Sequence, residues 1–187
     1  MCILSYFYQC EAAKGMIDMK IATKKIALCA VLTALALGLS TLENLFPIQF
    51  LIPLPGLKLG LANIVTVFAL YQLGILPAFL ILIGRCFLAS LFAGNFNALL
   101  FSLMGGVLAM LVMIVLKQIS ALSIYGVSIG GAAAHNIGQI CAAIITLGSA
   151  KVLGYLPLLL AVSLFTGALT GFVSSLLFRS MKNITLS

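Results

Sequence analysis

Acidic and imidazole side chains are scarce in this sequence. Its 187 residues include only three Asp or Glu and one His. Mg²⁺-dependent chemistry on diphosphates needs clustered carboxylates to hold the metal, and the sequence has no such cluster. One histidine without a neighbouring carboxylate or cysteine cannot form a catalytic triad. GxSxG, HExxH and nucleotide-binding loop patterns are also missing. The sequence therefore predicts no catalytic residue and no resident cofactor.

Metal-binding spacing and basic runs are missing as well. The five cysteines form no CxxC or Cys/His pattern, so no metal site is predicted. Cys29, Cys86 and Cys141 fall in apolar segments, where a small thiol packs well. The net charge is +7, but the Lys and Arg residues are scattered, without a run of five and without interleaved aromatics. This pattern excludes nucleic-acid binding and is typical of membrane topology signals.

Apolar residues are what the sequence has in excess. It is 64% hydrophobic and 7% charged, with a mean hydropathy of +1.30. A soluble domain of this size could not bury so much apolar surface. Apolar runs of about 20 residues instead predict an all-α, polytopic membrane protein. We expect one domain over residues 19–182 with six transmembrane helices, at approximately 26–46, 57–73, 75–93, 98–116, 124–150 and 158–178.

The segments between and outside these spans have their own signatures. The stretch 47–56, PIQFLIPLPG, holds three of the five prolines and predicts a capping or re-entrant loop. The sequence GNFN at 94–97 predicts a tight turn. Residues 1–18 are too short in their apolar part to span a membrane, so we interpret them as an overextended start or a disordered tail. Residues 183–187 form a C-terminal tail.

Basic residues indicate the orientation of the chain. Six spans place both termini on one side, and that side carries seven flanking Lys or Arg residues. The opposite side has Lys151, with Lys58 at a helix edge. By the positive-inside rule, the termini are predicted to be cytoplasmic.

Several polar residues are predicted to lie inside the membrane. At 1.5 Å per residue, Arg85 lies about 15 Å into the third span, and His135 reaches a similar depth in the fifth. His135, Asn136 and Gln139 are expected on one helix face. A charge at this depth is costly, so Arg85 should face the protein interior and contact a ligand, a functional partner or carbonyl groups at a Gly-rich turn. Asn136 and Gln139 either contact a ligand or brace a neighbouring helix.

Further polar residues gather toward the outer ends of the spans. Glu43 and Lys58 flank the proline-rich loop and are placed to form a pair, which would either bind a ligand or fix the loop. Asn63, Asn95 and Asn97 follow nearby, and Ser102 precedes Gly105-Gly106. Together these residues predict a pocket in the outer half of the bundle, beneath residues 47–56.

The outline resembles the substrate-binding S components of energy-coupling-factor (ECF) transporters. The first span, IALCAVLTALALGLS, carries Ala30 and Ala34 one helical turn apart. In that group, such an AxxxA face docks on a transmembrane T subunit, and the loop after the first helix caps an outward-facing pocket. The resemblance implies a T subunit and separate ATPases as partners.

Three further stretches are similar to the Gx transporter family, whose members are labelled heptaprenyl diphosphate synthase component I. They are PGLKLGLANIVTVFAL (55–70), GRCFLASLFAGNFNALLFSLMGG (84–106) and GGAAAHNIGQI (130–140), and the likeness covers about residues 20–178. Carried over by position, it implies a polar, substrate-binding set consisting of Glu43, Lys58, Asn63, Arg85, Asn95, His135, Asn136 and Gln139.

Three functions follow from this resemblance. The leading hypothesis is an S-component-like protein that binds a small anionic or polar solute for uptake. The second is a non-catalytic membrane subunit of polyprenyl diphosphate synthesis, with a soluble synthase as partner; any enzymatic role would be accessory, since the aspartate clusters of chain-elongating synthases are missing. The third is a membrane component of flavin- or quinone-dependent electron export, with a redox partner.

Overall fold

The described part of the chain is entirely helical. The computed structural model describes residues 23–43, 58 and 60–181, and these residues form helices and turns without a strand. The expected all-α class is thereby confirmed for them. The predictions for residues 1–18, 47–56 and 183–187 lie outside the described residues. In chain order the elements are a first helix (Thr23–Glu43), α2 (Asn63–Gln72), α3 (Ile75–Ala93), α4 (Phe96–Lys117), α5 (Ile124–Leu147), the 3₁₀ helix η2 (Ala150–Tyr155) and α6 (Leu156–Met181).

Five of these helices are long and apolar enough to cross a membrane. They are the first helix, α3, α4, α5 and the stretch Ala150–Ser180, which joins η2 to α6. The predicted second span corresponds to α2, which has 10 residues. Ten helical residues rise about 15 Å, roughly half the thickness of the hydrocarbon core. The chain is therefore a helical multi-pass membrane protein, whereas six crossings stay a prediction.

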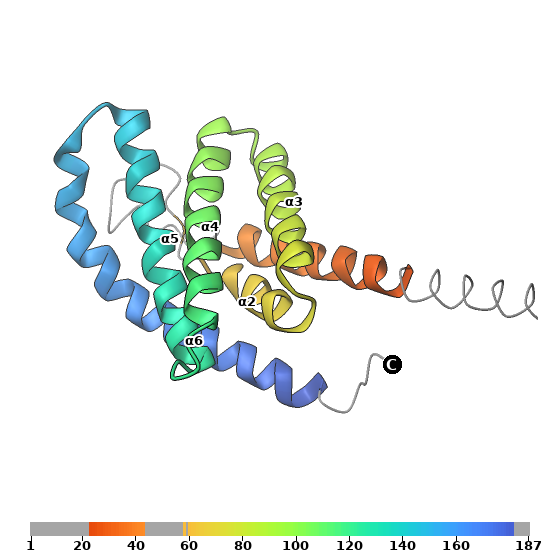
Figure 1. Ribbon diagram of the computed structural model, residues 1–187. Coiled ribbons are helices and arrows are strands. Elements are labelled where there is room, and N and C mark those ends of the chain that lie inside the picture. The colour runs from red at the N-terminus through yellow and green to blue at the C-terminus, as the bar shows by residue number, and fades with distance from the viewer. Residues whose placement is uncertain (1–22, 44–57, 59, 182–187) are drawn as a thin grey trace, which may run out of the picture.

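A tight turn joins α3 to α4, as the GNFN stretch predicts. Gly94 ends α3 in the left-handed region, with φ of 59°, which a glycine adopts without strain. Asn95 then starts α4, because its side-chain oxygen accepts a hydrogen bond from the backbone nitrogen of Asn97 at 2.9 Å. The two helices consequently run antiparallel and side by side (Figure 1).

Close helix contacts in the centre of the molecule depend on glycines. The most extensive contacts are those of α5 with α4 on one side and with α6 on the other. A Cβ atom on Gly138 would lie 2.5 Å from the carbonyl oxygen of Met104, and one on Gly167 would lie 2.5 Å from the Cα of Ile129. At the α4–α5 crossing and at the α5–α6 crossing, the backbones of the two helices are therefore in contact. Such packing through small residues is common in membrane proteins.

The short helix α2 is held in the interior. Eight of its ten residues are buried. At its C-terminal end, Lys117 of α4 donates a hydrogen bond to the carbonyl oxygen of Leu70 at 2.8 Å, and its ammonium lies 4.7 Å from the centre of the Tyr71 ring. A cation at a helix C-terminus also complements the helix dipole. These contacts fix α2 so that its first residue, Asn63, points into the middle of the bundle.

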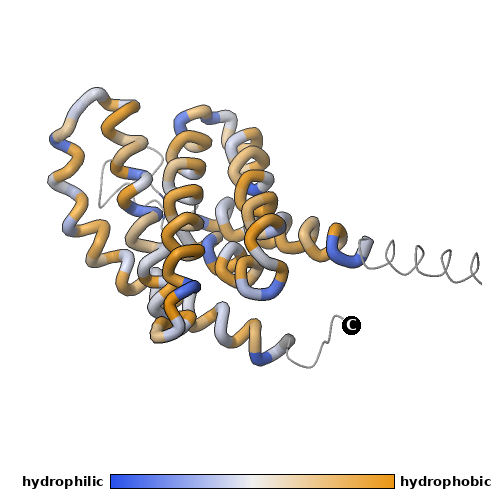
Figure 2. The backbone as a smooth tube through the Cα atoms, in the orientation of Figure 1, coloured by the Kyte–Doolittle hydropathy of each residue, from blue (hydrophilic) through white to orange (hydrophobic). Residues whose placement is uncertain are grey.

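The outer surface is apolar, as expected of helices in contact with lipid. Phe92, Phe96 and Phe165 are 75%, 77% and 80% exposed. Figure 2 shows the same pattern along the backbone, with hydrophilic stretches short and separated by long hydrophobic ones. The first helix runs across the direction of α3, α4 and α5 in Figure 1. Near its C-terminal end, Ser40 and Glu43 are buried, while most of its N-terminal half is exposed.

Candidate functional site

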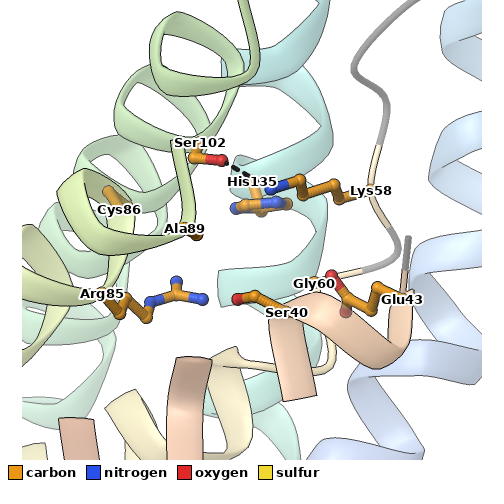
Figure 3. Close-up of a pocket in the computed structure, with 9 residues that line it drawn as sticks. All are labelled: Ser40, Glu43, Lys58, Gly60, Arg85, Cys86, Ala89, Ser102 and His135. Carbon is orange, nitrogen blue, oxygen red and sulfur yellow. Dashed lines mark hydrogen bonds between the residues drawn. The ribbon is translucent and has the colours of Figure 1, made fainter. Parts of the chain in front are cut away.

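One buried pocket collects side chains from five separate segments of the chain. They come from the first helix, the segment before α2, and helices α3, α4 and α5 (Figure 3). Because these segments are far apart in sequence, only the packed bundle brings them together. The lining residues are Ser40, Glu43, Lys58, Gly60, Arg85, Cys86, Ala89, Ser102 and His135.

Arg85 reaches the pocket because it lies on the inward face of α3. The buried residues of α3 recur at helical spacing, and Arg85 falls among them at 5% exposed. Its Nη2 atom donates to the side-chain oxygen of Asn63 at 3.0 Å. The Nε atom of Arg85 and the Nδ2 atom of Asn63 are buried and have no hydrogen-bond partner among the described residues. Arg85 and Asn63 thus each have one buried N–H donor that forms no hydrogen bond with the described residues.

Lys58 and Glu43 face the same pocket but have different hydrogen-bond partners. The ammonium of Lys58 donates to the hydroxyl oxygen of Ser102 at 3.2 Å. The carboxylate of Glu43 accepts a hydrogen bond from the backbone nitrogen of Leu61, just before α2. These contacts replace the direct Glu43–Lys58 pair suggested by the sequence. Both side chains are nevertheless buried, at 5% and 9% exposure.

His135 forms the wall of the pocket on α5 and is oriented by Gln139, one turn further along. Gln139 Nε2 lies 3.0 Å from His135 Nε2. An amide nitrogen only donates, so the imidazole accepts at Nε2 and its proton lies on Nδ1. Two glycines leave room for the ring, since a Cβ on Gly105 would lie 2.8 Å from His135 Cε1 and one on Gly60 would lie 3.2 Å from His135 Cδ2. Gly60 also has φ of 83°, which disfavours any other residue.

Asn136 and Asn95, both part of the predicted set, lie elsewhere. Asn136 Nδ2 donates to the carbonyl oxygen of Leu159 in α6 at 2.7 Å, so this side chain braces α5 against α6. The expectation that it shares one face with His135 and Gln139 is therefore wrong, because a step of about 100° is enough to turn it toward a different helix. Asn95 is exposed and caps α4.

Four lining residues were not singled out by the sequence analysis as site residues. Ser40 precedes Glu43 by three positions and Ala89 follows Arg85 by four, so helical spacing from a charged residue identifies both. Cys86 is adjacent to Arg85 on the same buried face. Gly60 carries no such signal, since its place in the pocket depends on the path of the segment before α2.

Ala30 and Ala34 lie away from the pocket. Both are exposed on the first helix. Gly38 continues the same spacing, and a Cβ on it would have no neighbour within 4 Å. The first helix therefore presents a smooth strip of small residues that is not covered by the described part of the chain.

The pocket is small and carries an excess of positive charge. The space between the lining side chains is about 10 Å³, close to the minimum that holds one water molecule. Lys58 and Arg85 contribute two formal positive charges, and Glu43 contributes one negative charge. No group of three or more His, Cys, Asp or Glu side chains suited to a metal ion occurs among the described residues.

These features define the class: a helical multi-pass membrane protein with a buried, positively charged pocket. Residues 32–177, most of the chain, match the family described as heptaprenyl diphosphate synthase component I. The chain belongs to this family. The matched region includes every residue that lines the pocket. No match was found among curated proteins or among solved structures.

Proposed function

We propose that this chain is an integral membrane protein, similar to ECF S components, which binds a small anionic or polar solute for uptake with a separate energising module. The observation that supports the proposal is the charge of the pocket. Lys58, Arg85 and the single carboxylate of Glu43 surround one cavity inside a helical membrane protein.

The cost of burying these groups explains why a ligand is expected. Removing a charged group from water costs several kcal/mol unless a partner of opposite charge compensates. Within the described lining of the pocket, one of the two cations has no carboxylate to balance it. A purely structural arginine would have its donors satisfied, whereas Arg85 Nε has no acceptor in the described part of the chain. A bound anion would supply both the missing charge and the missing acceptor.

Replacing Arg85 with methionine tests this assignment. The protein is purified gently from native membranes, and mass spectrometry identifies the small molecules that accompany it. We expect Arg85→Met to lower the retained amount of the ligand by roughly 10- to 100-fold, since hydrogen bonds to charged groups contribute about 1.5–3 kcal/mol. The control is Lys151→Met, which removes an exposed cation in η2. Equal retention by Arg85→Met and the unmodified protein would refute the assignment.

The proposal also includes the topology and an energising partner. Six crossings with cytoplasmic termini would place Lys24, Lys25, Lys117 and Arg179 on the cytoplasmic side. The exposed Ala30 and Ala34 would contact a T subunit, which separate ATPases would drive. Small residues suit such a contact because they let two helices approach closely.

A bulky residue on the first helix tests the partner contact. We expect Ala34→Phe to reduce the amount of T subunit that copurifies, since the larger side chain holds the partner helix away. Leu35→Phe is the matched control, because Leu35 is also exposed, at 56%, but lies about 100° around the helix. Equal recovery of the partner with both variants would place the interface elsewhere.

The family description favours a second function, that of a non-catalytic subunit in polyprenyl diphosphate synthesis. In this role the pocket would bind the head group of a lipid substrate for a soluble synthase. The same purification separates the two functions. Recovery of an aspartate-rich synthase without a T subunit or ATPases would support the second one. Recovery of a flavin with redox proteins would instead support a role in electron export.

A further inference from the structure

The unused donors and the charge of the pocket define the head group that fits it. Building on the ligand-binding function proposed above, we propose that the pocket binds a single carboxylate group, held between Arg85, Asn63 and Lys58, and not a diphosphate. The substrate class is then a small organic acid.

Charge is the first argument. The pocket has one formal positive charge more than negative charges, with His135 accepting a hydrogen bond as a neutral ring. A carboxylate carries one negative charge and restores neutrality. A diphosphate carries at least two, and proteins usually balance the surplus with Mg²⁺ held by carboxylates. Among the described residues that line this pocket, Glu43 is the only carboxylate, and it already accepts from the backbone nitrogen of Leu61.

The second argument is the number and position of free donors. Among the described residues, Arg85 Nε, Asn63 Nδ2 and His135 Nδ1 are buried and unpartnered. Arg85 and His135 line the cavity, whereas Asn63 lies next to the lining residue Gly60. The 3.0 Å hydrogen bond from Arg85 Nη2 to Asn63 Oδ1 holds the guanidinium of Arg85 next to the carboxamide of Asn63. A carboxylate offers two acceptor oxygens in one plane, which suits two neighbouring N–H groups. Figure 3 shows Arg85 and Lys58 pointing into the pocket from different elements, so Lys58 is placed to contribute charge from another side.

Space is the third argument. The cavity of about 10 Å³ accommodates a group of roughly the size of one water molecule. A Cβ on Gly60 would lie 3.1 Å from Asn63 Nδ2, so the clearance beside this donor exists only because residue 60 has no side chain. A planar carboxylate is larger than one water molecule, so the lining side chains would have to move apart to admit it. A diphosphate, with two tetrahedral centres, would have to displace several of them.

Thermal unfolding of the full-length protein in detergent tests the head group. A thiol-reactive dye reports unfolding through Cys86, which is 2% exposed in the folded protein, as an increase over the signal of the exposed Cys141. Acetate, chloride and inorganic pyrophosphate serve as probes at matched ionic strength. Acetate at about ten times its Kd should raise Tm by about 3 to 6 °C. Chloride and pyrophosphate should have a much smaller effect, since chloride has no second acceptor atom and pyrophosphate carries too much charge.

Two variants test whether the acetate-dependent increase in Tm depends on Arg85 and Asn63. Arg85→Lys keeps the charge but removes Nε, so the acetate-dependent increase in Tm should be lost. Asn63→Asp is nearly the same size and can still accept from Arg85, but its negative charge should repel acetate and abolish the response while the protein stays folded. Lys151→Met, outside the pocket, should respond like the unmodified protein.

The outcomes separate this inference from the proposed function. A larger Tm increase with pyrophosphate than with acetate would overturn the carboxylate assignment and leave anion binding intact. An equal increase with chloride, or an undiminished acetate response in Asn63→Asp, would also overturn it. If no anion changes Tm and Arg85→Met retains the copurified ligand, both the head group and the ligand-binding function are wrong.

Discussion

Replacing Gly138 with alanine tests whether the α4–α5 crossing sustains the fold around the pocket. The added Cβ would lie 2.5 Å from the carbonyl oxygen of Met104 and 2.8 Å from the Cα of Gly105. Both neighbours are backbone atoms, so no side chain can rotate away, and the helices must separate until the distance reaches about 3.4 Å. Overpacking of this kind costs about 2 kcal/mol, which lowers Tm by roughly 4 to 8 °C for a chain of this size.

The assay is thermal unfolding followed by reaction of the buried Cys86 thiol. Gly38→Ala is the control, because Gly38 is also helical but a Cβ on it meets nothing within 4 Å. This control should be stabilised by about 0.4–1 kcal/mol, since alanine restricts the unfolded chain. Unfolding of Gly138→Ala at or above the Tm of the unmodified protein would show that the α4–α5 crossing has room for a Cβ atom and would refute this reasoning.

Two further predictions concern α6 and the topology. Asn136→Leu removes the hydrogen bond to the carbonyl oxygen of Leu159 and should destabilise the protein by about 1–3 kcal/mol, measured by thermal unfolding. The retained ligand should be unchanged, and its loss from folded protein would contradict the bracing role. Two reporters fused after Ser187 test the topology. Green fluorescent protein should fluoresce there and alkaline phosphatase should be inactive, because the C-terminus is predicted to be cytoplasmic. An active phosphatase would place the C-terminus outside.

Helix positions could largely be predicted from the sequence, with one exception. The expected third span, 75–93, coincides with α3, because Gly74 and Gly94 mark its ends in the sequence as well as in the structure. The expected span 57–73 contains only the ten-residue α2. Hydropathy measures the polarity of a segment and not its backbone conformation, so the non-helical path through Lys58 and Gly60 left no trace in the apolar pattern.

The pocket could be predicted in part. Depth along each span predicted that Arg85 and His135 lie at a similar level, because helical rise is regular, and both residues line the pocket. Direction around a helix was harder to predict. Asn136 and His135 are neighbours in sequence, yet one faces α6 and the other the pocket. Which face of α5 meets which neighbour depends on tertiary contacts, such as that of Gly138 with Met104, which a single sequence does not encode locally.

The short helix α2 links two distant parts of the protein mechanically. Its first residue, Asn63, accepts from Arg85 in the pocket, and its last turn is tied to Lys117 through the carbonyl of Leu70. A hydrogen-bonded helix of this length moves as a rigid rod, so a shift at one end is transmitted to the other over about 10 Å. Any rearrangement that admits a ligand beside Asn63 would therefore act directly on the lysine at the end of α4.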